Sequence, residues 1–264
     1  MSLVTILWTA AASAALLLSI VHLTVWAFGR KQHASLALAA AAVALVGVTF
    51  TELGMMQAGS PAEWGRWVYW LHFPMCFLLI SVALFVRLYF NAGRLWLLWT
   101  IILGRGAILI ANLALQPNFN FESISTIRRI SFLGEQVTVL DVGVTSGWQW
   151  LATLSVVLLV VYVADAAWSV WRRNGQDDRR KAVVVGGGTL LFVTIASFFT
   201  QLVIWRELQM PALIAAPYLI LVLAMAVELG WDTLLASALA RSLQESETRL
   251  ELAANAGQLG AILP

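Results

Sequence analysis

Long apolar segments alternate with short polar segments along the whole chain of 264 residues. The apolar segments reach about 20 residues, the length a helix needs to cross the hydrocarbon core of a bilayer. Turn clusters such as Ala58-Gly59-Ser60-Pro61, or charged residues, separate one segment from the next. We therefore predict seven membrane-spanning helices, at about residues 3–28, 34–57, 67–90, 95–115, 148–171, 182–205 and 210–254.

The last apolar segment differs from the others because no helix-breaking residue follows it. Residues 211–227 are almost wholly apolar, charge then enters at Glu228 and Asp232, and apolar residues continue at steps of three and four. These steps pass through Leu239, Leu243 and Leu250 and have the spacing of a coiled-coil seam. The pattern fits one helix that leaves the membrane and dimerises, and it fits a frayed amphipathic tail equally well.

A long polar segment, residues 116–147, separates the fourth and fifth spans. Loops of more than about 12–15 residues are usually functional or disordered. Residues 136–142 are rich in strand-forming side chains, and Gly134 precedes them where a turn is needed, so we predict a β-hairpin with its first strand at 130–133. The hairpin would form a lid over the outer mouth of the bundle, with either a sensing role or a packing role.

The predicted fold class is an all-α membrane protein. It is a seven-transmembrane helix bundle with a long outer loop, a β-hairpin in that loop, and a cytoplasmic coiled-coil extension of the last helix. We divide the chain into a transmembrane domain at 1–232, a signalling helix at 233–254 and the start of a further domain at 255–264.

Composition supports the membrane assignment. Hydrophobic residues make up 61% of the chain and charged residues only 11%, whereas soluble domains contain about 25% charged residues. The net charge of +2 is too small to indicate a nucleic-acid partner. The single cysteine, Cys76, excludes an internal disulfide and a cysteine metal cluster.

Lysine and arginine residues gather at alternate ends of the predicted spans. One side carries Arg30, Lys31, Arg87, Arg94, Arg172, Arg173, Arg179, Arg180 and Lys181. Short loops on the other side carry Arg66 and Arg206, each near an acidic residue. Because basic loops stay in the cytoplasm, we predict an outside N-terminus and a cytoplasmic C-terminus in a bacterial inner (plasma) membrane.

Polar side chains inside the spans are candidates for function because they are costly in lipid. Glu52 and His72 lie near the outer side, with Tyr69 one turn from His72. These residues could line a ligand or sensing pocket below the lid, or could simply form hydrogen bonds between helices. A histidine there would make such a pocket sensitive to pH.

A second group of polar residues lies deeper. Arg105 is halfway along the fourth span, and Asp165 on the fifth span is at a similar depth. Arginine keeps its proton, so Arg105 needs a counter-charge, water or an anion. A structural Arg105–Asp165 ion pair is one interpretation, and an anion site is the other. Asn112 and Gln201 add uncharged polar groups. The candidates for ligand binding or sensing are therefore Glu52, Tyr69, His72, Arg105 and Asn112.

Several cofactors are excluded by the residues present. Retinal needs a lysine within the bundle, but Lys31 and Lys181 lie at the cytoplasmic ends of spans. His22 and His72 are too far apart in depth for a haem, and no cluster of cysteine or histidine could bind zinc. We therefore expect no cofactor and no metal.

Five stretches resemble the N-terminal seven-transmembrane sensor region of bacterial, membrane-bound, PAS-containing sensor histidine kinases. They are QPNFNF (116–121), FLGEQV (132–137), WRR (171–173), AMAVEL (224–229) and RLELAANAGQLG (249–260), the last resembling the start of a PAS domain. The resemblance implies a signal-input module of a two-component system, with downstream cytoplasmic PAS and kinase domains. It also implies a homodimer in membrane lipid that responds to an unknown small-molecule ligand.

The sequence reaches Pro264 before any PAS sheet or kinase domain, so we expect these residues to be the sensor portion of a longer protein or of a truncated frame. These 264 residues should not act as an enzyme, although the full-length parent would be a histidine protein kinase. The alternative function is a small membrane transporter or membrane enzyme that uses Arg105, Asp165 and Glu52. A purely structural role in a larger complex is a third interpretation.

Overall fold

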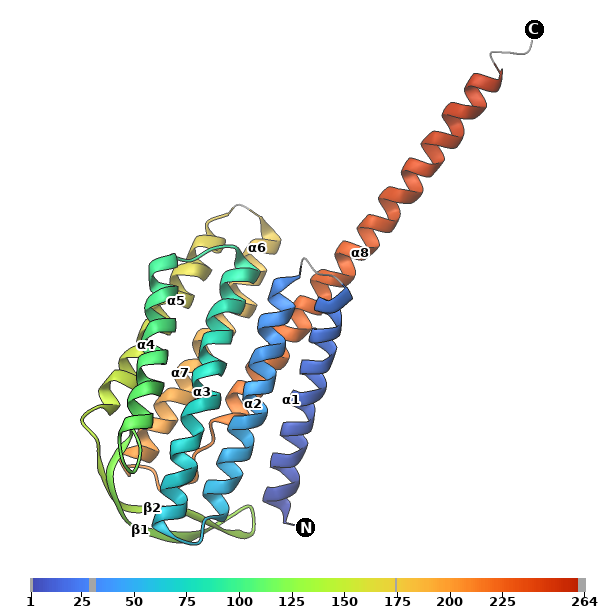
Figure 1. Ribbon diagram of the computed structural model, residues 1–264. Helices are drawn as coiled ribbons and strands as arrows, with labels where there is room; N and C mark the ends of the chain where they lie inside the picture. The colour runs from blue at the N-terminus through green and yellow to red at the C-terminus, as the bar shows by residue number, and fades with distance from the viewer. Residues whose placement is uncertain (1, 29–31, 174, 261–264) are drawn as a thin grey trace. The chain divides into compact units, whose positions relative to one another are not determined.

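A computed structural model describes residues 2–28, 32–173 and 175–260 of the chain, with backbone alone at 236, 237, 239–241 and 250–260. The described part is 77% helical and contains a two-stranded sheet. Seven of its helical segments are long and apolar enough to cross a membrane. The chain is therefore a multi-pass membrane protein, and the predicted helical bundle is confirmed at this level (Figure 1).

The helices follow the predicted spans closely in most places. Their bounds are α1 (Leu3–Phe28), α2 (His33–Gln57), α3 (Pro61–Phe90), α4 (Leu95–Ala114), α5 (Gln149–Trp171), α6 (Gln176–Lys181), the π-helical η1 (Ala182–Gly187), α7 (Gly188–Ile204) and α8 (Ala215–Gly260). The basic loop residues Arg30 and Lys31 lie outside the described residues.

The chain forms two compact units, Met1–Ala226 and Val227–Pro264, and α8 contributes to both. In the second unit the backbone is helical to Gly260. The seam residues Leu239 and Leu250 fall where side chains are not described, and Leu243 is exposed within the chain. The coiled-coil seam therefore stays a prediction.

Helix α3 begins at Pro61, earlier than the predicted start at 67. The Ser60 side chain accepts a hydrogen bond from the Glu63 backbone N–H at 3.2 Å, and the Glu63 carboxylate accepts one from the Gly59 N–H at 2.8 Å. This reciprocal arrangement satisfies amides at the start of the helix, and proline is well tolerated in the first helical turn. Polar residues at a span end thus extend the helix instead of ending it.

The sixth span is not a uniform α-helix. It starts with α6, passes through the π-helical turn η1, and continues as α7. A Cβ atom at Gly186 in η1 would lie 2.5 Å from the Cβ of Ala167, so the two helices approach closely only because residue 186 is glycine. Gly186 therefore serves helix packing, whereas a Cβ atom at Gly187 or Gly188 would meet nothing within 4 Å.

The polar segment between α4 and α5 forms the predicted β-hairpin, with longer strands than expected. Strand β1 (Phe121–Phe132) pairs antiparallel with β2 (Glu135–Thr145). The two-residue turn has positive φ at both Leu133 (53°) and Gly134 (80°), which is the backbone twist that tight hairpins prefer.

The hairpin lies across the end of the bundle where α1 begins (Figure 1). The Thr138 hydroxyl donates to the Ala58 carbonyl at 2.8 Å, and Val137 packs in a small core with Val4, Trp8 and Met56. At the turn, the Glu135 carboxylate accepts hydrogen bonds from the Ser2 hydroxyl and the Leu3 N–H. The Ser2 bond is the main reason that the pKa of Glu135 is lowered. The sheet is therefore fixed to both α1 and α2.

Helix α8 begins five residues later than predicted, at Ala215 instead of residue 210. The buried carboxylate of Glu52 on α2 accepts hydrogen bonds from the backbone N–H groups of Ile214 and Ala215, the latter at 2.9 Å. Its second oxygen accepts one from the Trp8 indole at 2.9 Å. A negative side chain stabilises a helix N-terminus, because the first backbone amides of a helix have no hydrogen-bond partners within it. Glu52 therefore connects α1, α2 and the start of α8.

Replacing Glu52 should reduce stability in proportion to the acceptors that are lost. Glu52→Ala leaves three buried donors without a partner and should lower the free energy of unfolding by about 3 kcal/mol or more. Glu52→Gln keeps one acceptor oxygen and should cost less. Thermal unfolding in detergent or nanodiscs would rank the two variants and the wild type by stability.

Glu122→Ala, an exposed position on β1, is the matched control. Trp8→Phe removes a single donor and should cost about 1 kcal/mol in the wild-type protein. If Glu52→Ala were no more destabilising than Glu122→Ala, Glu52 would not connect these helices.

Candidate functional site

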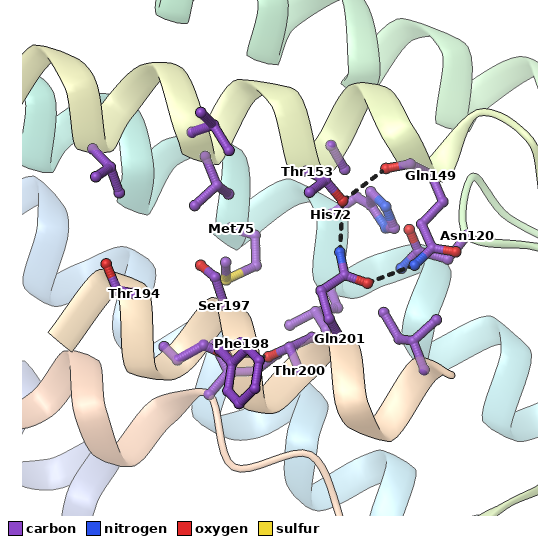
Figure 2. Close-up of a pocket in the computed structure, with 18 of the residues that line it drawn as sticks. His72, Met75, Asn120, Gln149, Thr153, Thr194, Ser197, Phe198, Thr200 and Gln201 are labelled. Carbon is purple, nitrogen blue, oxygen red and sulfur yellow. Dashed lines mark hydrogen bonds between the residues drawn. The ribbon is translucent and has the colours of Figure 1, made fainter. Parts of the chain in front are cut away.

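A pocket of about 460 Å³ lies in the first unit, between α3, α4, α5, α7 and the first turn of α8. It is open on one side, where the exposed side chains of Val157, Phe198 and Trp205 line it. Its volume falls in the range of small-molecule sites, about 300–1,000 Å³. The walls are mostly apolar, and Figure 2 shows side chains from α5 and α7 facing each other across it.

One part of the cavity wall is a hydrogen-bonded cluster of Gln149, Thr153 and Gln201 (Figure 2). The Gln149 amide donates to the Gln201 carbonyl oxygen at 2.7 Å, and the Gln201 amide donates to the Thr153 hydroxyl at 2.6 Å. These bonds join α5 to the last turn of α7. Because these polar groups form hydrogen bonds with one another, their first role is to hold α5 and α7 together.

His72 on α3 also lines the cavity. Its Nδ1–H donates to the Val68 carbonyl at 3.0 Å, and its ring lies 5.7 Å from the ring of Phe119, centroid to centroid. Asn120 lines the cavity beside it (Figure 2). The histidine is therefore held in one orientation by its own helix and by the segment that leads into the hairpin.

Arg105 on α4 is the positive charge of the cavity wall. Its side chain is only 7% exposed, and neither Nε nor Nη2 has a hydrogen-bond partner among the described residues. The neighbours near enough to interact with its charge are His72, Cys76 and Tyr218. Since an arginine cannot lose its proton here, the cavity contains a cation with two buried guanidinium nitrogens that have no hydrogen-bond partner among the described residues.

The predicted Arg105–Asp165 ion pair is not present among the described residues. Asp165 instead pairs with Arg94, with 3.3 Å between Oδ1 and the Arg94 Nε, and its Oδ2 accepts from the Arg94 backbone N–H at 3.2 Å. Arg94 precedes α4 and its side chain is 65% exposed. Arg105 and Asp165 have similar depth on their helices, but their side chains do not face each other. The sequence pattern gives the depth of a residue and not the direction of its side chain.

The other predicted pocket residues lie apart from the cavity. Glu52 faces a separate space of only about 20 Å³ next to the hairpin, so it forms no pocket with His72. The Asn112 side chain donates to the Tyr69 carbonyl at 3.1 Å and accepts from the Phe119 N–H at 2.9 Å. Tyr69 and Asn112 therefore join α3, α4 and the loop, and of the five predicted residues only His72 and Arg105 line the cavity.

Two cavity residues, Gln149 and Thr153, were not identified from the sequence. They are spaced four residues apart at the start of an otherwise apolar span, so they share one helix face. That spacing was the available signal. Gln201, their partner, was noted only as an uncharged polar group.

Comparison of the sequence with protein-family models gave no match, and comparison with curated proteins gave no match either. No group of three or more metal-binding side chains occurs within the described residues. The cavity combines one fixed cation, a polar cluster whose members bind one another, and apolar walls. Such a set can bind and orient a molecule.

Replacing Arg105 should stabilise the empty protein or leave its stability unchanged. A buried cation without a partner costs free energy, so Arg105→Met removes that cost while keeping a long apolar side chain. We expect a thermal unfolding midpoint equal to or above that of the wild type, measured without added ligand. Arg94→Met, which breaks the exposed ion pair with Asp165, should change stability by about 1 kcal/mol or less.

A structural arginine would behave in the opposite way. A fall in the unfolding midpoint for Arg105→Met well beyond that for Arg94→Met would show that the guanidinium holds the bundle together.

Proposed function

We propose that this chain is the transmembrane signal-input module of a two-component sensor histidine kinase. The observation that carries the proposal is that α8 is both a wall of the cavity and a 46-residue helix. Tyr218, in its first turn, and Ile214, directly before it, line the cavity. A bilayer needs only about 20 helical residues, so α8 has ample length to extend beyond a membrane.

The proposed mechanism is a shift between two arrangements of α8. A ligand changes such an equilibrium only if it binds one arrangement better than the other. Tyr218 is fully buried beside the cavity, so an occupant that contacts it is sensitive to the position of α8. Packed helices respond to such contacts by shifts of about 1–2 Å.

The proposed membrane is the bacterial inner membrane, with the N-terminus outside. The hairpin and the start of α1 lie at the same end of the bundle, so both would face outward (Figure 1). The far part of α8 would then be cytoplasmic, where a second copy would pack along Leu239, Leu243 and Leu250. Downstream PAS and kinase domains would read the resulting change in the dimer, and lipid would cover the exposed apolar faces of the spans.

The transporter or enzyme alternative gains no specific support from the geometry. It needs Arg105, Asp165 and Glu52 along one path. In the structure Arg105 lines the large cavity, Asp165 binds Arg94, and Glu52 caps the segment before α8. The three residues do not line a common space.

A fusion of residues 1–260 to the catalytic core of a membrane histidine kinase tests the proposal. Ser197 on α7 lines the cavity, so Ser197→Phe should fill part of it and bias α8. We expect autophosphorylation in nanodiscs to change by about fivefold or more, in either direction, because that is the range of typical couplings between sites.

Leu191→Phe is the matched control. Leu191 is exposed on the same helix, does not line the cavity, and should accept a larger side chain in lipid without an effect. Equal autophosphorylation by the wild type and Ser197→Phe, with both proteins folded, would refute coupling between the cavity and α8.

A further inference from the structure

The cavity contains one permanent charge and no acid. Arg105 is the sole Lys or Arg among its lining residues, and no Asp or Glu lines it in the described part of the chain. The Arg105 side chain is more than nine-tenths buried, and its Nε and Nη2 atoms have no partner there. A ligand with a single anionic group would supply the charge-assisted hydrogen bonds that these atoms lack.

Several of the other polar groups are occupied, whereas the Thr194 and Ser197 hydroxyls also line the cavity. Gln149, Gln201 and Thr153 bind one another, and the Thr200 hydroxyl donates to the Ala196 carbonyl of its own helix at 2.7 Å. His72 uses Nδ1–H for the Val68 carbonyl. A sugar or another molecule with many hydroxyl groups would find few partners, and a cationic ligand would face Arg105 without a counter-charge.

The rest of the cavity is a long apolar surface. Val156, Val157 and Val160 line it from α5. Phe198 and Ile204 line it from α7, and Trp205 lines it directly after that helix. The lining residues of α5 run from Gln149 to Val160, a length of about 16 Å along the helix. A small inorganic anion would leave this surface uncovered, whereas an apolar chain would cover it.

We infer that the cavity binds a single-chain amphiphilic acid, whose carboxylate pairs with Arg105 and whose apolar chain lies between α5 and α7. The inference rests on the proposed function for the role of the ligand as stimulus. It adds the chemical class, which the proposed function leaves open. The binding itself requires no kinase domain.

The phosphate group of a membrane lipid is also an anion that could pair with Arg105. The two possible ligands, a membrane lipid and a free acid, must therefore be distinguished. Arg105 lies near the middle of α4 (Leu95–Ala114), about 15 Å from either end of the helix. A bilayer phospholipid would have to bring its whole head group from the membrane interface to this depth. A cavity of about 460 Å³ suits one chain better, and this favours a free carboxylate.

The experiment measures ligand adducts on the intact chain by native mass spectrometry after release from detergent. The probes are decanoate, decan-1-ol and phosphatidylglycerol, each titrated separately. Decanoate should bind about tenfold or more tightly than decan-1-ol, because hydrogen bonds to a charged partner contribute about that much. Arg105→Met should remove this preference and leave decan-1-ol binding unchanged.

Two further variants guard against a folding artefact. Ser197→Phe, which retains Arg105 but occupies the apolar space, should weaken decanoate by about tenfold or more, in line with the loss of a buried aliphatic segment. Leu191→Phe should bind decanoate as the wild type does. Each variant is checked for its unfolding midpoint before titration.

Equal affinity for decanoate and decan-1-ol, or undiminished decanoate binding by Arg105→Met, would overturn the inference. Phosphatidylglycerol binding that depends on Arg105, without decanoate binding, would also overturn it and assign the site to a lipid head group. Arg105-dependent decanoate binding with no effect on the kinase fusion would uphold the site and refute the signalling function. A kinase fusion that responds to Ser197→Phe in a protein that does not bind decanoate would uphold the signalling function and refute the proposed ligand.

Discussion

The carboxylate of Glu52 is the contact on which the arrangement of the helices depends. It is fully buried and accepts hydrogen bonds from the Trp8 indole and from the backbone amides of Ile214 and Ala215. A buried acid is tolerated in an apolar bundle only when its oxygens are satisfied, and here the N-terminus of a helix satisfies them. Because Ala215 is the first residue of α8, the same contact decides where that helix begins. It also keeps residues 210–214 out of the helix, next to the hairpin.

Arg105 presents the opposite situation within the same bundle. Asp165 is paired with Arg94, and Asn112 holds two backbone groups, whereas two Arg105 nitrogens have no partner in the described structure. An unpaired buried cation costs stability, and the proposed binding of an anion beside Arg105 would offset that cost. One polar residue thus holds α8 in place and another marks the cavity beside it. Both act on the start of the helix that would carry the signal.

Much of this fold follows from the sequence, and the parts that do not have physical reasons. Segment length and hydropathy predicted the spans to within a few residues, and β-propensity with Gly134 predicted the hairpin. The sequence pattern places the start of the last helix at residue 210, because apolar composition cannot reveal a cap supplied by Glu52 from a distant segment. Depth along a helix suggested that Glu52 would meet His72 and that Arg105 would meet Asp165. Depth is one coordinate, and the rotation of each helix, set by packing such as Gly186 against Ala167, decides which side chains face each other.

The central claim is that an occupant of the cavity moves α8. The most direct test is the distance between spin labels at position 243 in two copies of the chain, measured in nanodiscs by pulsed electron resonance. We expect one population with the cavity empty, and a shift of about 1–2 Å or a new population when Phe occupies position 197. Leu191→Phe should give the wild-type distribution. Identical distributions for all three proteins, or no pair of labels close enough to couple, would contradict the claim.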